Sequence, residues 1–234
     1  MRLVFFMICA VFFTASAVEE EFNSYREAAA AAEKKNDMVS ALENYDLALS
    51  ATRNSALKLE VLQAEYRILL KQQKGRVLEE KLTRALEDAS LKECHQRAVL
   101  NMLAGFLIWS DRYEYALNLL NRAGMLEAPR ASNEYYQTYE GKARIWFSRK
   151  NRPEVALEIL QEVLNIPETH PANRYSANLL AGSACEKLGR PAEALSYYRT
   201  AVAMGKKVTY KFSTAAAEKA VERLTGKNGK GKLE

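Results

Sequence analysis

Residues 180–201 read LAGSACEKLGRPAEALSYYRTA, and this stretch decides the fold. It opens with a small pair, Ala181-Gly182, and is interrupted by a turn-forming Gly-Arg-Pro at 189–191. Its second half carries a small residue, a tyrosine four positions later and a small residue three beyond that: Ala194, Tyr198 and Ala201. Spacings of four and three place residues on one face of an α-helix. The stretch therefore predicts a helical hairpin whose backbones approach closely at the small residues, while the tyrosine fills the remaining space.

The triplet on the second helix recurs along most of the chain. Its other copies are Ala41-Tyr45-Ala48, Leu78-Leu82-Ala85, Ala116-Leu120-Ala123 and Ala156-Leu160-Val163. The copies begin at 41, 78, 116, 156 and 194, so successive copies lie 37, 38, 40 and 38 residues apart. Such a period indicates a repeat architecture in which each hairpin packs on its neighbours. We expect repeats near 22–55, 59–92, 97–130, 137–170 and 175–208, followed by an amphipathic capping helix over 209–226.

Each hairpin is expected to turn at a short break rich in cap and turn residues. The breaks are Asn36-Asp37, Lys74-Gly75, Ser110-Asp111, Asn151-Arg152-Pro153 and Gly189-Arg190-Pro191. Asp and Asn can cap the following helix, and proline fits its first turn. Connections this short make neighbouring helices antiparallel.

At these positions the chain resembles the tetratricopeptide repeat family. The resemblance rests on Ala181-Gly182 with Gly189 and the triplet at Ala194, and on Ala104-Gly105 with the triplet at Ala116. It covers residues 22 to about 208, and the copy at Leu78 is degenerate. The resemblance implies an all-α, right-handed α-solenoid of about five hairpins. It also implies a protein that binds another polypeptide on its concave face and is not an enzyme.

The first seventeen residues have the layout of a secretory signal. Arg2 precedes an apolar run from Leu3 to Phe13, and small residues lead to Ala17. The run is short for a membrane span, which takes roughly 17–25 apolar residues. We expect residues 1–17 to be a signal peptide cleaved after Ala17, and the mature chain to be periplasmic or secreted, in a bacterial envelope. The alternative is an uncleaved anchor that tethers the repeats to the membrane.

Charge gives little support for a nucleic-acid partner. The formal net charge is +5, and removal of Arg2 lowers it to +4. The segment 227–234 contains three lysines and one glutamate, so half of that surplus lies in a tail expected to be disordered. The remaining body is nearly neutral, which argues against nucleic-acid binding despite a sequence pI near 9.0.

The residues that could carry chemistry are few and scattered. His95 and His170 belong to different repeats, and neither has metal-ligand spacing, so we expect no metal, no cofactor and no catalysis. Cys94 and Cys185 lie two repeats apart, too far for a disulfide, and are expected to be thiols. Charged runs such as Glu79-Glu80-Lys81 are typical of a solvated helix face. A hydrolase would require a cleft that brings a histidine beside a carboxylate.

Binding residues are predicted from helix phase, since the first helix of each hairpin lines the inner wall of a stacked array. Positions off the packing stripe give the candidates Asn23, Arg26, Glu60, Gln63, Arg67, Asn101, Thr138, Tyr139 and Glu186. The alternative is that they are ordinary exposed positions. The aromatic run from Tyr135 to Phe147 is open to two interpretations, core or contact patch. We expect a protein or peptide partner, with self-association left open by the alanine-rich segment 28–32.

Overall fold

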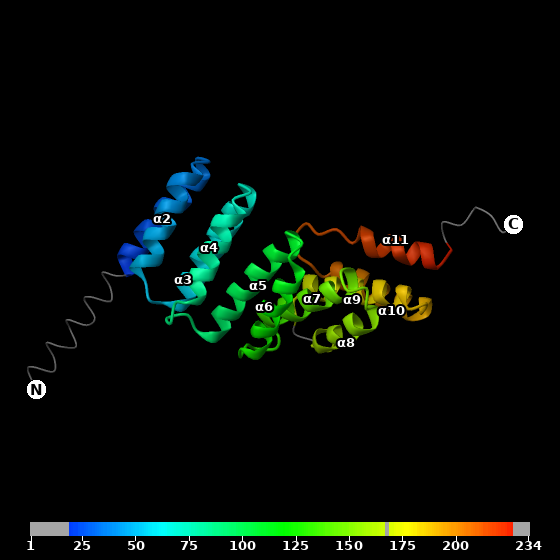
Figure 1. The fold of residues 1–234 in the computed structure, drawn as a ribbon. Helices are drawn as coiled ribbons and strands as arrows, with labels where there is room; N and C mark the ends of the chain where they lie inside the picture. Colours follow the sequence, from blue (N-terminus) through cyan, green and yellow to red (C-terminus); the bar gives the residue numbers. More distant parts are fainter. Residues whose placement is uncertain (1–18, 167–168, 227–234) are drawn as a thin grey trace, which may run out of the picture. The chain divides into compact units, whose positions relative to one another are not determined.

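The computed structural model describes residues 19–166 and 169–226, and every regular element there is a helix (Figure 1). The chain divides into two compact units between Leu103 and Ala104. The division falls inside a helix, whereas the repeat spacing predicted one continuous array over 18–226. The predicted signal peptide and the basic tail lie outside the described residues.

The first unit contains two complete hairpins and the beginning of a third. Its helices are a segment over 19–34, α2 (Met38–Ala51), α3 (Ser55–Lys71), α4 (Gly75–Leu86) and the N-terminal part of α5 (Glu93–Trp109). Figure 1 shows α2, α3 and α4 side by side, with α3 packed against both others. One core cluster joins Phe22 and Ala29 of the first helix to Ala41 of α2 and Val61 of α3.

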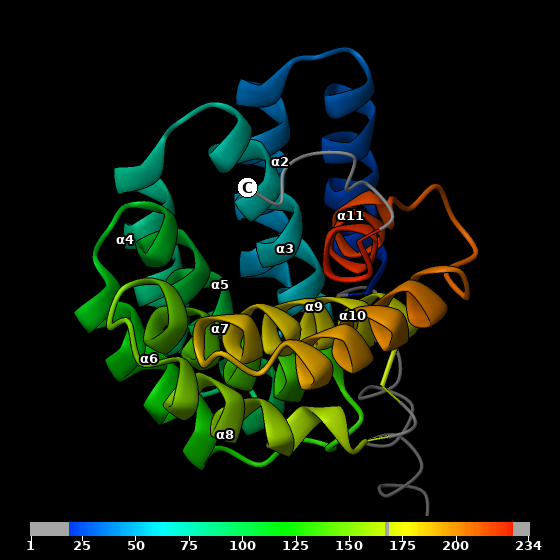
Figure 2. The same cartoon turned by 90° about the vertical axis from the view of Figure 1, so that its right-hand side faces the viewer.

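The second unit contains the end of α5 and the remaining helices. These are α6 (Tyr113–Met125), α7 (Asn133–Ser148), α8 (Pro153–Leu164), α9 (Pro171–Lys187), α10 (Pro191–Gly205) and α11 (Ala215–Leu224). Figure 2 shows α9 and α10 side by side, and α9 also packs on α8. The helix α11 packs on α10, as expected of a capping helix, although it begins at Ala215 rather than near 209.

The same backbone conformation recurs at the turn of each hairpin. Each turn contains one residue with positive φ: Asn36 (60°), Gln73 (58°), Asp111 (64°), Asn151 (51°) and Gly189 (70°). The next amide usually donates to the carbonyl five residues earlier, as in Asp37 N–H to Ala32 O (2.9 Å) and Arg190 N–H to Cys185 O (2.9 Å). This bonding closes the first helix as a Schellman motif.

The predicted breaks are therefore turns, but most of them do not use the expected side-chain caps. Asp37 alone among the five accepts from the next helix, through the Ser40 amide at 3.1 Å. The equivalent positions have no side-chain cap hydrogen bond, because they hold Lys74, Arg112, Arg152 and Arg190.

The triplets that define the repeat lie in the core. Fourteen of the fifteen residues are buried, including Ala194 (0% exposed), Tyr198 (2%) and Ala201 (0%). The remaining residue is Ala85, which is half-buried. Gly182 meets the triplet tyrosine as predicted, since a Cβ there would lie 2.6 Å from Tyr198 Cε1. Gly105 is exposed, so the close approach predicted at that position is wrong.

The first helices begin earlier than the expected repeats. For the second to fifth hairpins they begin at 55, 93, 133 and 171, four residues before the expected 59, 97, 137 and 175. Three of these starts are capped by side chains of Asn54, Ser132 and His170, which accept from amides of the first turn. The triplets lie on the second helix of each hairpin, so their spacing does not predict the caps at which the first helix begins. In the described part of the chain, no helix is both long and apolar enough to span a bilayer.

Candidate functional site

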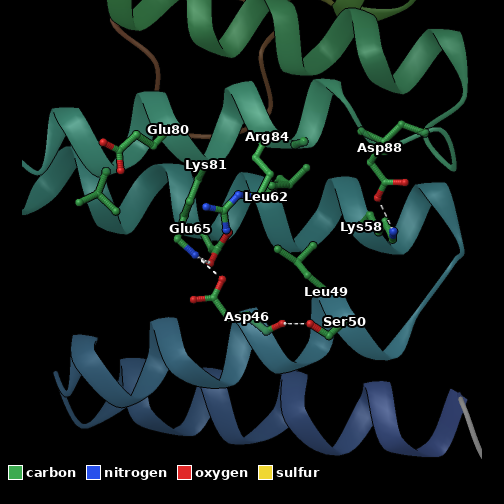
Figure 3. A pocket seen from close by; sticks show the side chains of 13 residues that line it. Asp46, Leu49, Ser50, Lys58, Leu62, Glu65, Glu80, Lys81, Arg84 and Asp88 are labelled. Carbon is green, nitrogen blue, oxygen red and sulfur yellow. Dashed lines mark hydrogen bonds and ion pairs between the residues drawn. The ribbon is translucent and has the colours of Figure 1, made fainter.

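The helices α2, α3 and α4 of the first unit enclose a pocket of about 530 Å³, here called the α2–α4 groove. Figure 3 shows its side chains: α3 forms the floor and the other two helices form the walls. Its apolar lining consists of the aliphatic residues Leu49, Leu62, Val77, Ala85 and Leu91. The groove runs along the degenerate repeat, where the third triplet residue, Ala85, is only half-buried.

One end of the groove holds a buried charge cluster. Glu65 is 1% exposed, and its Oε1 accepts from Lys81 Nζ at 2.7 Å, while Lys81 also donates to the Asp46 carboxylate. The other oxygen, Glu65 Oε2, has no hydrogen-bond partner among the described residues. Burial raises the pKa of Glu65 to about 7, because Lys81 only partly offsets desolvation. Burial by itself lowers the pKa of Lys81, but the hydrogen bonds that Lys81 donates to both carboxylates outweigh this effect and leave that pKa raised.

The other end of the groove holds a second ion pair. Lys58 donates to the Asp88 carboxylate and to Ser90 Oγ at 2.9 Å, and Asp88 also accepts from the Ser90 amide at 2.8 Å. The hydrogen bond from Lys58 is the main reason that the pKa of Asp88 is lowered to about 2. This pair ties the start of α3 to the segment after α4.

Arg84 differs from the other cations of the groove. Figure 3 shows its side chain pointing from α4 into the groove, on the same wall as Lys81. Arg84 is exposed, and among the described residues its side chain makes no hydrogen bond or ion pair. Glu80, one turn earlier, also lines the groove but pairs with Arg76 at 3.2 Å. The groove therefore has ion-paired charges at both ends, aliphatic side chains between them and, among the described residues, one guanidinium without an ion-pair partner.

The sequence pattern does not predict this site. The run Glu79-Glu80-Lys81 is typical of a solvated face, but the Lys81 side chain is only 21% exposed and bridges helices. Its signal in the sequence was indirect: the degenerate triplet at Leu78 marks the hairpin that lines the groove.

Five of the predicted binding residues lie on the helix over 19–34 and on α3. Arg26 Nη1 donates to Glu60 Oε1 at 3.0 Å, which joins the helix over 19–34 to α3. Gln63 and Arg67 are exposed three and seven positions after Glu60, on the same face of α3. We call Arg26, Glu60, Gln63 and Arg67 the α3 polar face; Asn23, half-buried, precedes Arg26 by one turn.

The other four predicted residues have different surroundings. Asn101 is 7% exposed and Thr138 is fully buried, with its hydroxyl donating to Glu134 O at 2.9 Å, so the open positions expected for both are corrected. Tyr139 is half-buried, with its ring 4.7 Å from that of Tyr135.

The carboxylate of Glu186, the last predicted binding residue, is already hydrogen-bonded to other side chains of the fold. Its carboxylate accepts from Tyr198 Oη at 2.6 Å and from both terminal nitrogens of Arg223, at 2.5 and 2.9 Å. It therefore holds α11 in place.

The aromatic run of α7 belongs mainly to the core. Tyr135 and Tyr136 are buried, and Trp146 and Phe147 pack against the same cluster. Lys187 Nζ lies 4.3 Å from the centre of the Phe147 ring. Of the two interpretations, the structure supports packing.

The histidines and cysteines have local roles. His95 Nδ1 lies 2.5 Å from Ser55 Oγ, a buried hydroxyl, and His170 caps α9. Both Cys94 and Cys185 are free thiols, the first half-buried and the second buried, as predicted. Within residues 19–166 and 169–226, no group of three His, Cys, Asp or Glu is arranged to hold a metal ion.

Similarity to known proteins is found in the fold and not in the sequence. The sequence matches no protein-family model and no curated protein. Solved structures do match, among them PilF of Pseudomonas aeruginosa, with a TM-score of 0.61 and 17% identity over 93% of this chain and 96% of that one. A tetratricopeptide repeat protein of Parabacteroides merdae gives a TM-score of 0.60 and 17% identity, over 89% and 75% of the two chains. The fold is that of tetratricopeptide repeat proteins.

Two further neighbours share this tetratricopeptide fold. MamA matches with a TM-score of 0.56 and 21% identity, over 83% of this chain and 98% of that one. YrrB, described as a tetratricopeptide repeat protein with an unusual peptide-binding site, gives 0.54 and 18%, over 88% and 96%. Identities this low establish the fold and leave function to the residues of this chain.

Proposed function

We propose that this protein is an exported, non-catalytic scaffold that binds a segment of a partner polypeptide on its α3 polar face. The observation that carries the proposal is the state of Gln63 and Arg67. Both side chains are exposed, and neither side chain makes a hydrogen bond or ion pair within the described residues. They adjoin the Arg26–Glu60 pair, so donors and acceptors from two consecutive first helices lie on one surface.

A polypeptide suits such a surface because its backbone and polar side chains supply both donors and acceptors. The Gln63 amide can donate and accept, and the Arg67 guanidinium offers several donors in one plane. The fold supports this choice, since a neighbour of the same fold, YrrB, is described as binding a peptide.

Export is the second part of the proposal and rests on the sequence of residues 1–17. We place the mature chain in a bacterial envelope, in an assembly or secretion complex. The alternative is an uncleaved anchor that presents the hairpins beside a translocation or assembly machine. Terminal sequencing of the protein from its own cells separates the two: Val18 as the first residue supports export, and an intact Met1–Ala17 segment supports the anchor.

The binding proposal is tested by crosslinking in the native cells, comparing the full-length wild type with Arg67→Glu and Gln63→Ala. The matched control is Arg76→Glu, which reverses a guanidinium 93% exposed on α4. A crosslinked polypeptide lost with Arg67→Glu and retained with Arg76→Glu supports the proposal. If the same adducts form with all variants, the α3 polar face is not the site.

A further inference from the structure

We propose that the α2–α4 groove is a second binding site, which takes a short acidic segment of a polypeptide: one carboxylate with aliphatic neighbours. The groove residues of α3 are Lys58, Leu62 and Glu65. At 100° per residue they lie opposite Glu60, Gln63 and Arg67 on the helix. The groove is thus separate from the α3 polar face, and either site can fail without the other.

Charge in the groove singles out Arg84. Lys58 is paired with Asp88, and Lys81 with Asp46 and Glu65. Arg84 alone among the three cations lining the groove has no ion-pair partner in the described residues. A guanidinium binds a carboxylate through two parallel hydrogen bonds, so one carboxylate is the group that matches it.

The rest of the lining selects the neighbours of that carboxylate. Leu49, Leu62, Val77 and Leu91 offer an aliphatic surface, which favours aliphatic side chains over polar ones. A volume of about 530 Å³ lies within the range of ligand pockets.

The same lining disfavours polyanions. Four carboxylates, those of Asp46, Glu65, Glu80 and Asp88, border the groove. A nucleic acid or another phosphate-rich ligand would bring several negative charges against them, with a single free arginine to compensate. An isolated carboxylate avoids this repulsion.

The test begins with a displayed library of random linear eight-residue peptides, selected on the full-length wild-type protein. Recovered peptides are synthesised with a fluorophore, and their affinities are measured by anisotropy. We expect a shared Asp or Glu beside aliphatic residues. Arg84→Glu should weaken binding about tenfold or more, the effect of losing a charge-assisted hydrogen-bonded pair.

Three matched comparisons make the result specific. Arg76→Glu, on the same helix but facing solvent, should change affinity less than twofold. Replacing the peptide's acidic residue with lysine should restore binding to Arg84→Glu and weaken binding to the wild type. Arg67→Glu should leave peptide binding unchanged, which separates this site from the α3 polar face.

Several outcomes would overturn the proposal. They are recovered peptides without an acidic residue, affinities insensitive to Arg84→Glu, and equal losses with Arg84→Glu and Arg76→Glu. Thermal melts of the variants guard against misfolding: an Arg84→Glu protein that melts with the wild type and still binds the peptides contradicts the assignment of Arg84. If Arg67→Glu does not abolish the crosslink in native cells, that result contradicts the proposed function and leaves the groove proposal unaffected.

Discussion

The hydroxyl of Tyr198 donates a hydrogen bond to Glu186 Oε2, at 2.6 Å, and so joins the middle of α10 to the end of α9. Tyr45 makes the same bond to Glu33 Oε1, at 2.5 Å and with the same separation of twelve residues. Burial, followed by the bond to Glu186, raises the pKa of Tyr198 to about 12. The triplet tyrosine therefore does two things in a hairpin: its ring fills the core, and its hydroxyl ties the two helices together.

Gly182→Ala should destabilise the protein by about 1–3 kcal/mol, because the added Cβ would lie 2.6 Å from a Tyr198 ring that is 2% exposed. This clash outweighs the gain of about 1 kcal/mol that alanine brings to a helix. Urea unfolding measures the change. Gly124→Ala is the control, because its Cβ would meet only the flexible end of Lys142. A loss that is unchanged when Tyr198→Leu is added would show that the tyrosine is not the cause.

Glu65→Gln should change how stability depends on pH. The folded pKa of about 7 exceeds the ordinary 4.5, so between these values the folded state holds a proton that the unfolded state releases. This contribution is fully present below pH 4.5 and is lost as pH rises through 7. The wild type should lose roughly 2 kcal/mol relative to the variant between pH 5 and 8.

Urea unfolding at four pH values in that window measures the difference. Glu87→Gln, at the exposed C-cap of α4, serves as the control and should keep the wild-type profile. Parallel profiles for the wild type and Glu65→Gln would contradict a raised pKa.

Ser55→Ala should destabilise the junction between α3 and α5 by about 1–3 kcal/mol. Ser55 Oγ accepts from the Lys92 amide at 2.8 Å and shares a hydrogen bond with His95. Because Ser55 is buried, water cannot take over these hydrogen bonds in the alanine variant without rearrangement. Hydrogen exchange at residues 92–96 should accelerate. Ser50→Ala removes only a bond to the carbonyl of its own helix and should have little effect. Equal exchange in both variants would refute the junction.

Arg223→Ala should loosen α11 while leaving the rest of the second unit intact. The guanidinium meets Glu186 through two hydrogen bonds, and only Ala217 and Ala220 of this helix are buried. Amide exchange in α11 should rise by an order of magnitude or more, with a small change in melting temperature, because the Arg223 side chain is 59% exposed. Lys219→Ala is the matched control on the same helix. Unchanged exchange in Arg223→Ala would mean that apolar packing alone holds α11.

Local spacing was enough to predict the hairpins. Four- and three-residue intervals between Ala194, Tyr198 and Ala201 report which side of a helix is buried, and that property belongs to the helix itself. Helix starts were less predictable, because the side chains of Asn54 and Ser132 cap their helices through local hydrogen bonds that are not part of any periodic pattern.

The sequence by itself determined the helical repeat and the turns, since these follow from residue size, spacing and chain geometry. Only the tertiary structure decided that Thr138 is buried, that Glu186 holds α11 and that Glu65 lies beneath Lys81. A polar residue has the same helical phase whether its face meets water or another helix. Its environment depends on which distant helices cover that face, and local periodicity carries no record of them.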